Sequence, residues 1–209
     1  MPKVRFPESA TLADALTQRT AESKGSSFYS ILNAFERSFP ELRREDLLAR
    51  MDPEPARILA SDQMLAASWY PVAWYLSMHQ AIQETAGGGN ETAWNLGYMG
   101  TKADFGERGL YHFMARTLGP KTVLSLGGRV FGLYWRPAGM RIMGLKGRNA
   151  ARATWTGCLG FNELLWHDIF GSIAAILEVS GCPLKELQVL KASQDLSALL
   201  IEAEWTTTA

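Results

Sequence analysis

The last segment of the chain constrains the fold more than any other. Leu199, Ile201, Ala203 and Trp205 alternate there with Leu200, Glu202 and Glu204. A period of two places the first set on one face, so residues 199–205 are predicted to form a strand with one buried side. Residues 184–191 precede it across the turn 192–195, which completes a hairpin.

A second hairpin is predicted between residues 140–146 and 151–155, around the turn Gly147-Arg148-Asn149. Between the two hairpins, a long helix starts near Asn162 and ends before Gly181 and Pro183. Four strands in two local hairpins are expected to form one antiparallel sheet with this helix across one face. The class is therefore α+β, with helices in the first half and hairpin-helix-hairpin after them.

The first half has helical periodicity. Four helices are expected, over residues 27–39, 71–85, 90–118 and 120–135. Ser27 caps the first and Asn90 caps the third, and Pro71 takes the first position of the second. Gly87-Gly88-Gly89 separates the second helix from the third. Pro53 and Pro55 mark a break, because proline is excluded from a helix interior. We divide the chain there into a helical segment, 1–52, and a main α+β domain, 53–209, within one unit.

Composition excludes several classes of protein. The 21 basic and 21 acidic residues balance, whereas a nucleic-acid binder usually carries a positive excess. No apolar run reaches about 18 residues, since His167 and Asp168 interrupt the best one, so we expect no membrane span. Residues 1–11 lack the apolar centre of a signal peptide. Cys158 and Cys182 are therefore expected to stay reduced, in the cytoplasm.

Catalytic and metal-binding motifs are not found. The sequence has no Gly-x-Ser-x-Gly elbow, no phosphate loop and no short-spaced Cys or His pairs. Three histidines limit acid–base chemistry. His112 shares a helical stripe with Arg108 and Arg116, which is typical of a solvated face, and His167 is four residues after Glu163, which is typical of surface support. We expect no catalytic residue and no metal site.

Aromatic residues are the other prominent feature. The candidates for binding a ligand are Trp74, Tyr75, His79, Trp94 and Tyr98. A helix with aromatic side chains over a wide arc is either central to the core or part of a pocket or subunit interface. His79 lies on the face of Tyr75 and could ligate haem iron or be a buried, hydrogen-bonded histidine. Both alternatives stay open for these residues.

Basic residues gather between Arg136 and Arg152. Arg141, Lys146 and Arg148 lie between these two, in or near the predicted hairpin. They could meet an acidic partner or an anionic ligand. The alternative is an edge strand that charge protects from aggregation.

The order of elements resembles that of vinyl-reductase (V4R) and TRAPP-subunit domains, and it is similar in layout to haem nitric-oxide-binding domains. Gly157-Cys158-Leu159-Gly160, the helix after it, the Gly181-Cys182 break and the strands up to Trp205 carry this likeness. Tyr70-Pro71-Val72 and Glu204-Trp205 also resemble an uncharacterised family of myxobacterial paralogues of about 200 residues. The sensors carry a Tyr-x-Ser-x-Arg clamp for the haem propionates, where this chain has Gly144-Leu145-Lys146-Gly147-Arg148.

The resemblance implies a ligand-sensing or dimerising module with an apolar pocket. We therefore expect a non-enzymatic signalling or assembly domain, which binds a small apolar ligand or a protein partner and forms a homodimer. No cofactor is required by this expectation. Two alternatives stay open: a haem-based gas sensor that uses His79 or His112, and an enzyme with an unrecognised site that uses carboxylates such as Asp104 or Glu163.

Overall fold

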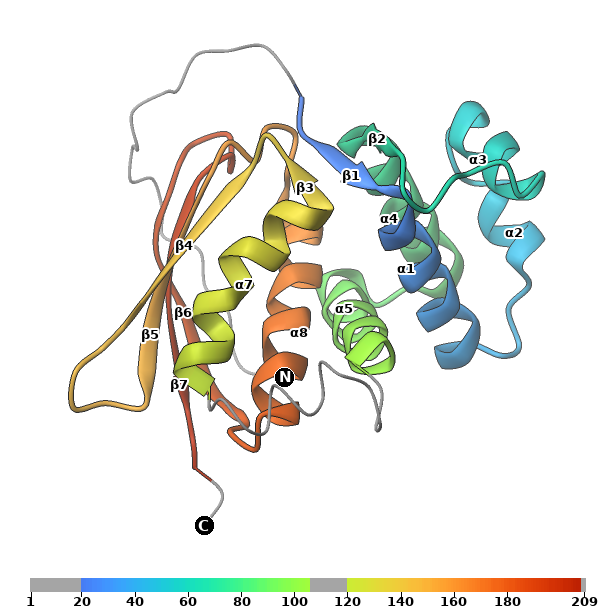
Figure 1. Cartoon of the computed structure of the whole chain (residues 1–209). Coiled ribbons are helices and arrows are strands. Elements are labelled where there is room, and N and C mark those ends of the chain that lie inside the picture. The colour runs from blue at the N-terminus through green and yellow to red at the C-terminus, as the bar shows by residue number, and fades with distance from the viewer. Residues whose placement is uncertain (1–19, 106–119, 208–209) are drawn as a thin grey trace.

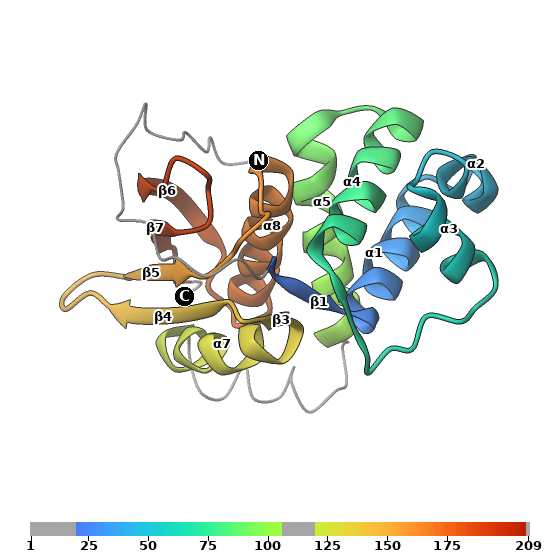
Figure 2. The ribbon, with the colours of Figure 1, turned by 90° about the horizontal axis from the view of Figure 1, so that it is seen from above.

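A computed structural model describes residues 20–105 and 120–207, and it has the expected α+β architecture. In Figure 1 a four-stranded sheet stands on the left, and helices are layered behind it towards the right. Helices α7 and α8 lie against the sheet, α5 lies behind α8, and α1 to α4 form the far side. Figure 2 shows the same order of layers from above.

The far side consists of short and medium helices, namely α1 (Gly25–Ser38), α2 (Arg44–Leu48), α3 (Pro53–Ala60) and α4 (Val72–Ala86). Helix α1 begins two residues before the predicted cap. The amides of Gly25 and Ser26 donate to the carbonyl oxygens of Ser68 and Ala66, each at 2.9 Å, so a loop caps this helix. The expected break at Pro53 is the start of α3, because proline needs no amide partner in a first turn.

Helices α4 and α5 (Gly89–Phe105) are separated by the predicted glycine turn, in which Gly87, Gly88 and Gly89 all have positive φ. Pro71 lies just outside α4 and ends a short strand, one residue before its predicted place. Helix α7 spans Pro120–Tyr134, as expected. The predicted continuation of α5 to residue 118, with the stripe of Arg108, His112 and Arg116, lies outside the described residues.

The four-stranded sheet confirms the two predicted hairpins. Its strands, β4 (Gly139–Gly144), β5 (Ala150–Thr156), β6 (Leu184–Ala192) and β7 (Leu199–Trp205), are antiparallel in the order β4-β5-β7-β6. Between the hairpins runs α8 (Glu163–Val179), which begins where predicted, because the Asn162 side chain accepts a hydrogen bond from the Leu165 amide. Every second residue of β7 is buried, from Leu199 to Trp205.

A second, three-stranded sheet was not predicted. Its strands are β1 (Glu22–Lys24), β2 (Trp69–Pro71) and β3 (Trp135–Arg136), in the order β2-β1-β3. Strands of two or three residues have no detectable period, and β1 pairs with residues more than a hundred positions away. The sheet joins the start of α1, the start of α4 and the end of α7.

Two glycines allow α5 and α8 to pack closely. A methyl group at Gly97 would overlap the backbone oxygen of Asp168, and one at Gly171 would overlap that of Trp94. Glycine at position 171 therefore permits the close approach of the α5 backbone to α8. The backbones of α5 and α8 thus lie so close that a side chain larger than glycine would not fit at position 97 or 171.

One hydrophobic cluster extends through the described parts of the chain, from Phe28 and Leu47 on the far side to Trp155 and Ile201 in the sheet. Residues on both sides of position 52 belong to it. In the described ranges, no helix is both long and apolar enough to cross a membrane.

Candidate functional site

Three buried ionisable side chains meet where α4 packs on α8. The Tyr75 hydroxyl donates to Oδ2 of Asp168 at 2.9 Å, and Nε2 of His79 lies 3.6 Å from the same oxygen. All three residues are at most 4% exposed. Burial, and next the Asp168 carboxylate, raise the pKa of Tyr75 well above its usual value, so the phenol stays protonated and can donate.

His79 is held without a hydrogen bond at Nε2. The 3.6 Å contact with Asp168 is longer than a hydrogen bond, and Nε2 has no other partner among the described residues. The imidazole lies edge-on to the Tyr75 ring at 4.9 Å. The Asp168 carboxylate, its donor Tyr75 and the adjacent His79 imidazole thus form a small polar group that an otherwise apolar interface encloses.

Aromatic rings surround this group. The ring centroid of Tyr75 lies 5.1 Å from that of Phe28 and 5.2 Å from that of Trp135, both edge-to-face. The centroids of Trp135 and Phe161 are 4.9 Å apart, in the same arrangement. Phe161 continues the chain of rings to Trp166 at 5.1 Å. These are the separations of directly packed rings, so aromatic side chains fill the interior beside Tyr75.

The structure separates the five predicted binding residues. Only Tyr75 and His79 come together. Trp74 stacks on Tyr70 at 5.5 Å, and Trp94 is buried where α5 crosses α8. Tyr98 is half-buried and donates to Glu178 at 2.6 Å, with Lys102 bonded to both. The five residues do not line one common site, and their role in binding stays a prediction.

The remaining candidate groups lie apart from this cluster. His167 was expected at the surface but is buried, because α8 is covered on nearly all sides; its Nδ1 lies 2.8 Å from the carbonyl oxygen of Glu163. Burial lowers the pKa of His167. Asp104 accepts a hydrogen bond from Ser30, and Cys158 and Cys182 are both free thiols, as expected. His112 lies outside the described residues.

Asp168 is the member of the cluster that sequence reasoning missed. It was noted only as an interruption of the apolar run 164–177. A lone carboxylate inside such a run is itself a signal, because a helix that is apolar all round is buried, and a buried carboxylate needs donors. The donor, Tyr75, comes from α4 and lies 93 positions earlier in the chain, so the pairing could not be read from spacing.

Comparison with known proteins identifies the fold. No family model matches the sequence, and no curated protein does. Solved structures of H-NOX domains do match. One is the Fe(II) unliganded H-NOX protein from K. algicida, with a TM-score of 0.65 at 11% identity over 88% of this chain and 97% of that one. Another is an oxygen-binding H-NOX domain related to soluble guanylate cyclases, with a TM-score of 0.61 at 11% identity over 87% and 94%.

A point mutant of the H-NOX domain from T. tengcongensis is similar to a lower degree, with a TM-score of 0.52 at 12% identity over 89% of this chain and 99% of that one. The chain is thus an α+β domain with the H-NOX fold, which is the haem nitric-oxide-binding layout that the order of elements resembled. The resemblance to the myxobacterial paralogues has no support from these comparisons.

The described residues do not fit a haem. An axial histidine needs a ring nitrogen that faces open space, but Nε2 of His79 faces the Asp168 carboxylate at 3.6 Å. The stretch Gly144–Arg148, compared above with the propionate clamp, ends β4 and forms the outer hairpin turn, where Arg148 pairs with Glu202 at 2.8 Å. Within the described ranges, no three His, Cys, Asp or Glu side chains are grouped to hold a metal ion.

Proposed function

We propose that this protein is a non-enzymatic regulatory domain with the H-NOX fold, which acts by binding a protein partner through its surface. The observation that carries the proposal is the state of the interior. The polar groups at the meeting point of α4 and α8 contact one another, and aromatic rings pack directly beside them. Among the described residues, rings packed this closely beside Tyr75 stabilise the domain and leave little space for a substrate there.

Catalysis has little support from this geometry. Among the described residues, Tyr75, His79 and Asp168 are the ionisable groups that converge, yet each is at most 4% exposed. A catalytic group has to reach a bound substrate within hydrogen-bond distance. Asp104 and Glu163 bond to separate partners, Ser30 and Asn90, and do not converge.

A haem-based gas sensor is the second candidate, and two observations favour it. The solved structures with this fold include an H-NOX protein named as Fe(II) unliganded and an H-NOX domain named as an oxygen complex. The unpartnered Nε2 of His79 is also the type of atom that ligates iron. The fold therefore favours the haem-based sensor. The packing of side chains around His79 instead favours the domain that binds a protein partner.

A haem titration separates the two candidates. Haem is added to the purified protein, and the absorbance near the Soret region is followed for wild type, His79→Ala and His112→Ala. The proposal predicts no stoichiometric band in any of the three proteins. A band that saturates at one haem per chain and is lost in one of the two variants would establish the sensor and identify its ligand. The dimer expected from the sequence stays a prediction, which light scattering tests.

A further inference from the structure

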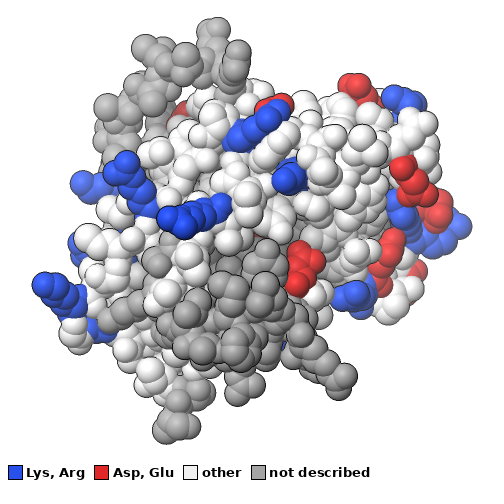
Figure 3. Space-filling view, in the orientation of Figure 1, with Lys and Arg blue, Asp and Glu red and all other residues white. Residues whose placement is uncertain are grey.

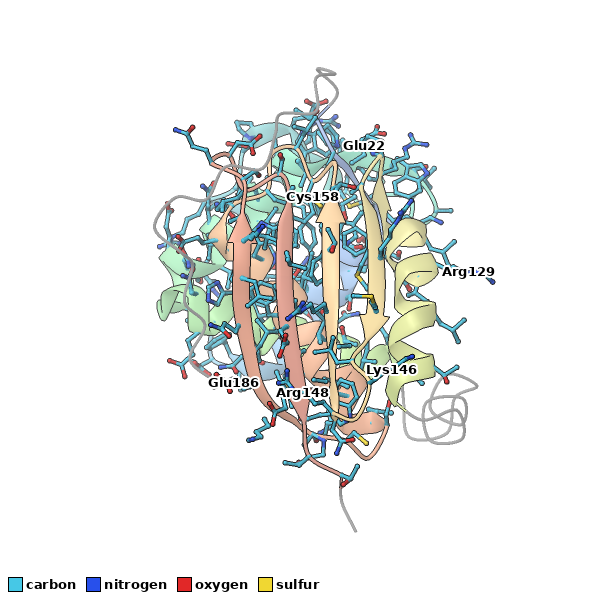
Figure 4. All side chains as sticks on the ribbon, turned by 90° about the vertical axis from the view of Figure 1, so that its left-hand side faces the viewer. Glu22, Arg129, Lys146, Arg148, Cys158 and Glu186 are labelled. Atoms are coloured by element: carbon cyan, nitrogen blue, oxygen red, sulfur yellow. The ribbon has the colours of Figure 1, made fainter. Side chains whose placement is uncertain are left out.

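The four-stranded sheet has one covered and one uncovered face. Trp155, Ile201 and Leu187 are buried, and α7 and α8 lie against one face of the sheet (Figure 1). No described helix or strand covers the other face, which is turned towards the viewer in Figure 4. Residues on this uncovered face follow each other across the sheet in rows that the strand register defines.

Two such rows cross all four strands. The first consists of Met143, Arg152, Glu202 and Gln188, and the second of Arg141, Thr154, Leu200 and Lys191. The second row thus has a cation at each edge strand, with Thr154 and the half-buried Leu200 between them. Met143 is 61% exposed, which makes it one of the most exposed large apolar side chains of the described residues.

Charge on this face is only partly compensated. Glu202 forms ion pairs with Arg148 at 2.8 Å and with Arg152 at 3.0 Å, and Glu204 pairs with Lys185 at 2.6 Å. Arg141 and Lys191 have no ion pair among the described residues. The face and its hairpin turn hold six basic and three acidic side chains: Arg141, Lys146, Arg148, Arg152, Lys185 and Lys191 against Glu186, Glu202 and Glu204.

Figure 3 views the sheet from its edge, and on that left-hand side the visible charged side chains are mainly Lys and Arg, whereas both signs mix over the helices on the right. A net positive face attracts an acidic surface, and exposed Met and Arg side chains are enriched at protein interfaces. A nucleic-acid binder usually carries a clear positive excess, whereas the net charge of this chain is zero, which favours a protein as the partner.

We propose that this uncovered face of the sheet, with Arg141 and Lys191 at its edges and Met143 exposed, docks an acidic amphipathic helix of a partner protein. The inference deepens the proposed function and rests on it, since it names the surface and the chemistry of the partner. The edge strands are three spacings apart, about 14 Å. Carboxylates eleven positions apart on one helical face, roughly 16 Å, would reach both cations.

The test uses a fluorescein-labelled helical peptide with two glutamates eleven positions apart and leucines between them on the same face. Fluorescence anisotropy measures its binding to wild type, to Arg141→Glu/Lys191→Glu and to Arg37→Glu/Arg57→Glu. The last variant reverses two exposed arginines of the far helices and therefore matches the change in net charge. Thermal melts verify that all three proteins fold, and a scrambled peptide controls for charge alone.

We expect wild type to bind the peptide, with affinity that falls as salt rises, and with amide shifts at Thr154 and Leu200 in NMR spectra. Arg141→Glu/Lys191→Glu should bind about tenfold more weakly, while Arg37→Glu/Arg57→Glu stays within about twofold of wild type. No binding, or equal losses in both variants, would overturn the docking face. If a 20-base-pair DNA or phosphatidylserine vesicles bound more tightly than the peptide, the proposed protein partner would be wrong, and a nucleic acid or a membrane would take its place. The haem titration tests only whether the interior binds haem, so a failure of the proposed function can be told apart from a failure of the docking face.

Discussion

The Tyr75 hydroxyl and the Asp168 carboxylate, 2.9 Å apart, join α4 to α8 by a buried hydrogen bond. This bond connects the far helices to the helix that covers the sheet, across an interface that is otherwise largely apolar. His79 adds an imidazole on the same side of the carboxylate.

Removal of the carboxylate should destabilise the fold strongly. Asp168→Ala leaves the Tyr75 hydroxyl buried without an acceptor, so we expect the free energy of unfolding to fall by about 3 kcal/mol. Tyr98→Phe removes a hydrogen bond to a half-exposed carboxylate, Glu178, and should cost under about 1 kcal/mol. Urea denaturation measures both. Equal costs would show that the buried bond contributes no more than a surface one.

The glycines at the crossing of α5 and α8 give a second prediction. A methyl group at Gly97 or Gly171 would overlap backbone atoms, so Gly97→Ala and Gly171→Ala should each lower stability by about 3 kcal/mol. Gly132 in α7 has no described atom within 4 Å of an added methyl group. Gly132→Ala should instead raise stability by about 0.5 to 1 kcal/mol, because alanine favours a helix. Thermal denaturation of the three variants gives the comparison, and a stable Gly97→Ala protein would contradict the close packing.

The sequence predicted the larger elements because each has a local signal. The alternation of residues 199–205, the cap at Asn162 and the glycines after Ala86 are all visible within a few positions. The small sheet and the Tyr75–Asp168 bond depend on pairs that are tens to more than a hundred positions apart. Local patterns carry no information on such pairs, which is why the site was predicted only through Tyr75 and His79.

Two buried tryptophans provide a matched pair for a third prediction. Nε1 of Trp166 donates to the carbonyl oxygen of Leu196 at 2.9 Å, whereas Nε1 of Trp155 has no partner among the described residues. Both side chains are fully buried, so phenylalanine leaves a similar gap at each position. Trp166→Phe should therefore cost about 1 kcal/mol more than Trp155→Phe, since only the former loses a hydrogen bond. The reverse order in urea denaturation would contradict the assignment of these contacts.

Stability should also depend on pH through His167. Burial lowers the pKa of His167 in the folded chain below its usual value of about 6.5, so the unfolded chain binds more protons in mildly acidic solution. Stability is then fully present above that value and is lost as the pH falls through it towards the folded pKa. Carboxylates with lowered pKa, such as Glu178, contribute only in more acidic solution.

The free energy of unfolding at about pH 7.5 and pH 5.5, obtained by urea denaturation, tests this for wild type and His167→Gln. We expect a smaller loss between the two pH values in the variant, because glutamine does not titrate. An unchanged loss would assign the pH dependence to other groups.

The central claim is that the protein's own side chains fill its interior and that it acts at its surface. Native mass spectrometry of the purified protein tests this claim most directly. The account predicts that every charge state gives the mass of the polypeptide alone, or of an integral multiple of it. A stoichiometric non-covalent adduct of haem mass or of another small molecule, released on unfolding, would contradict it.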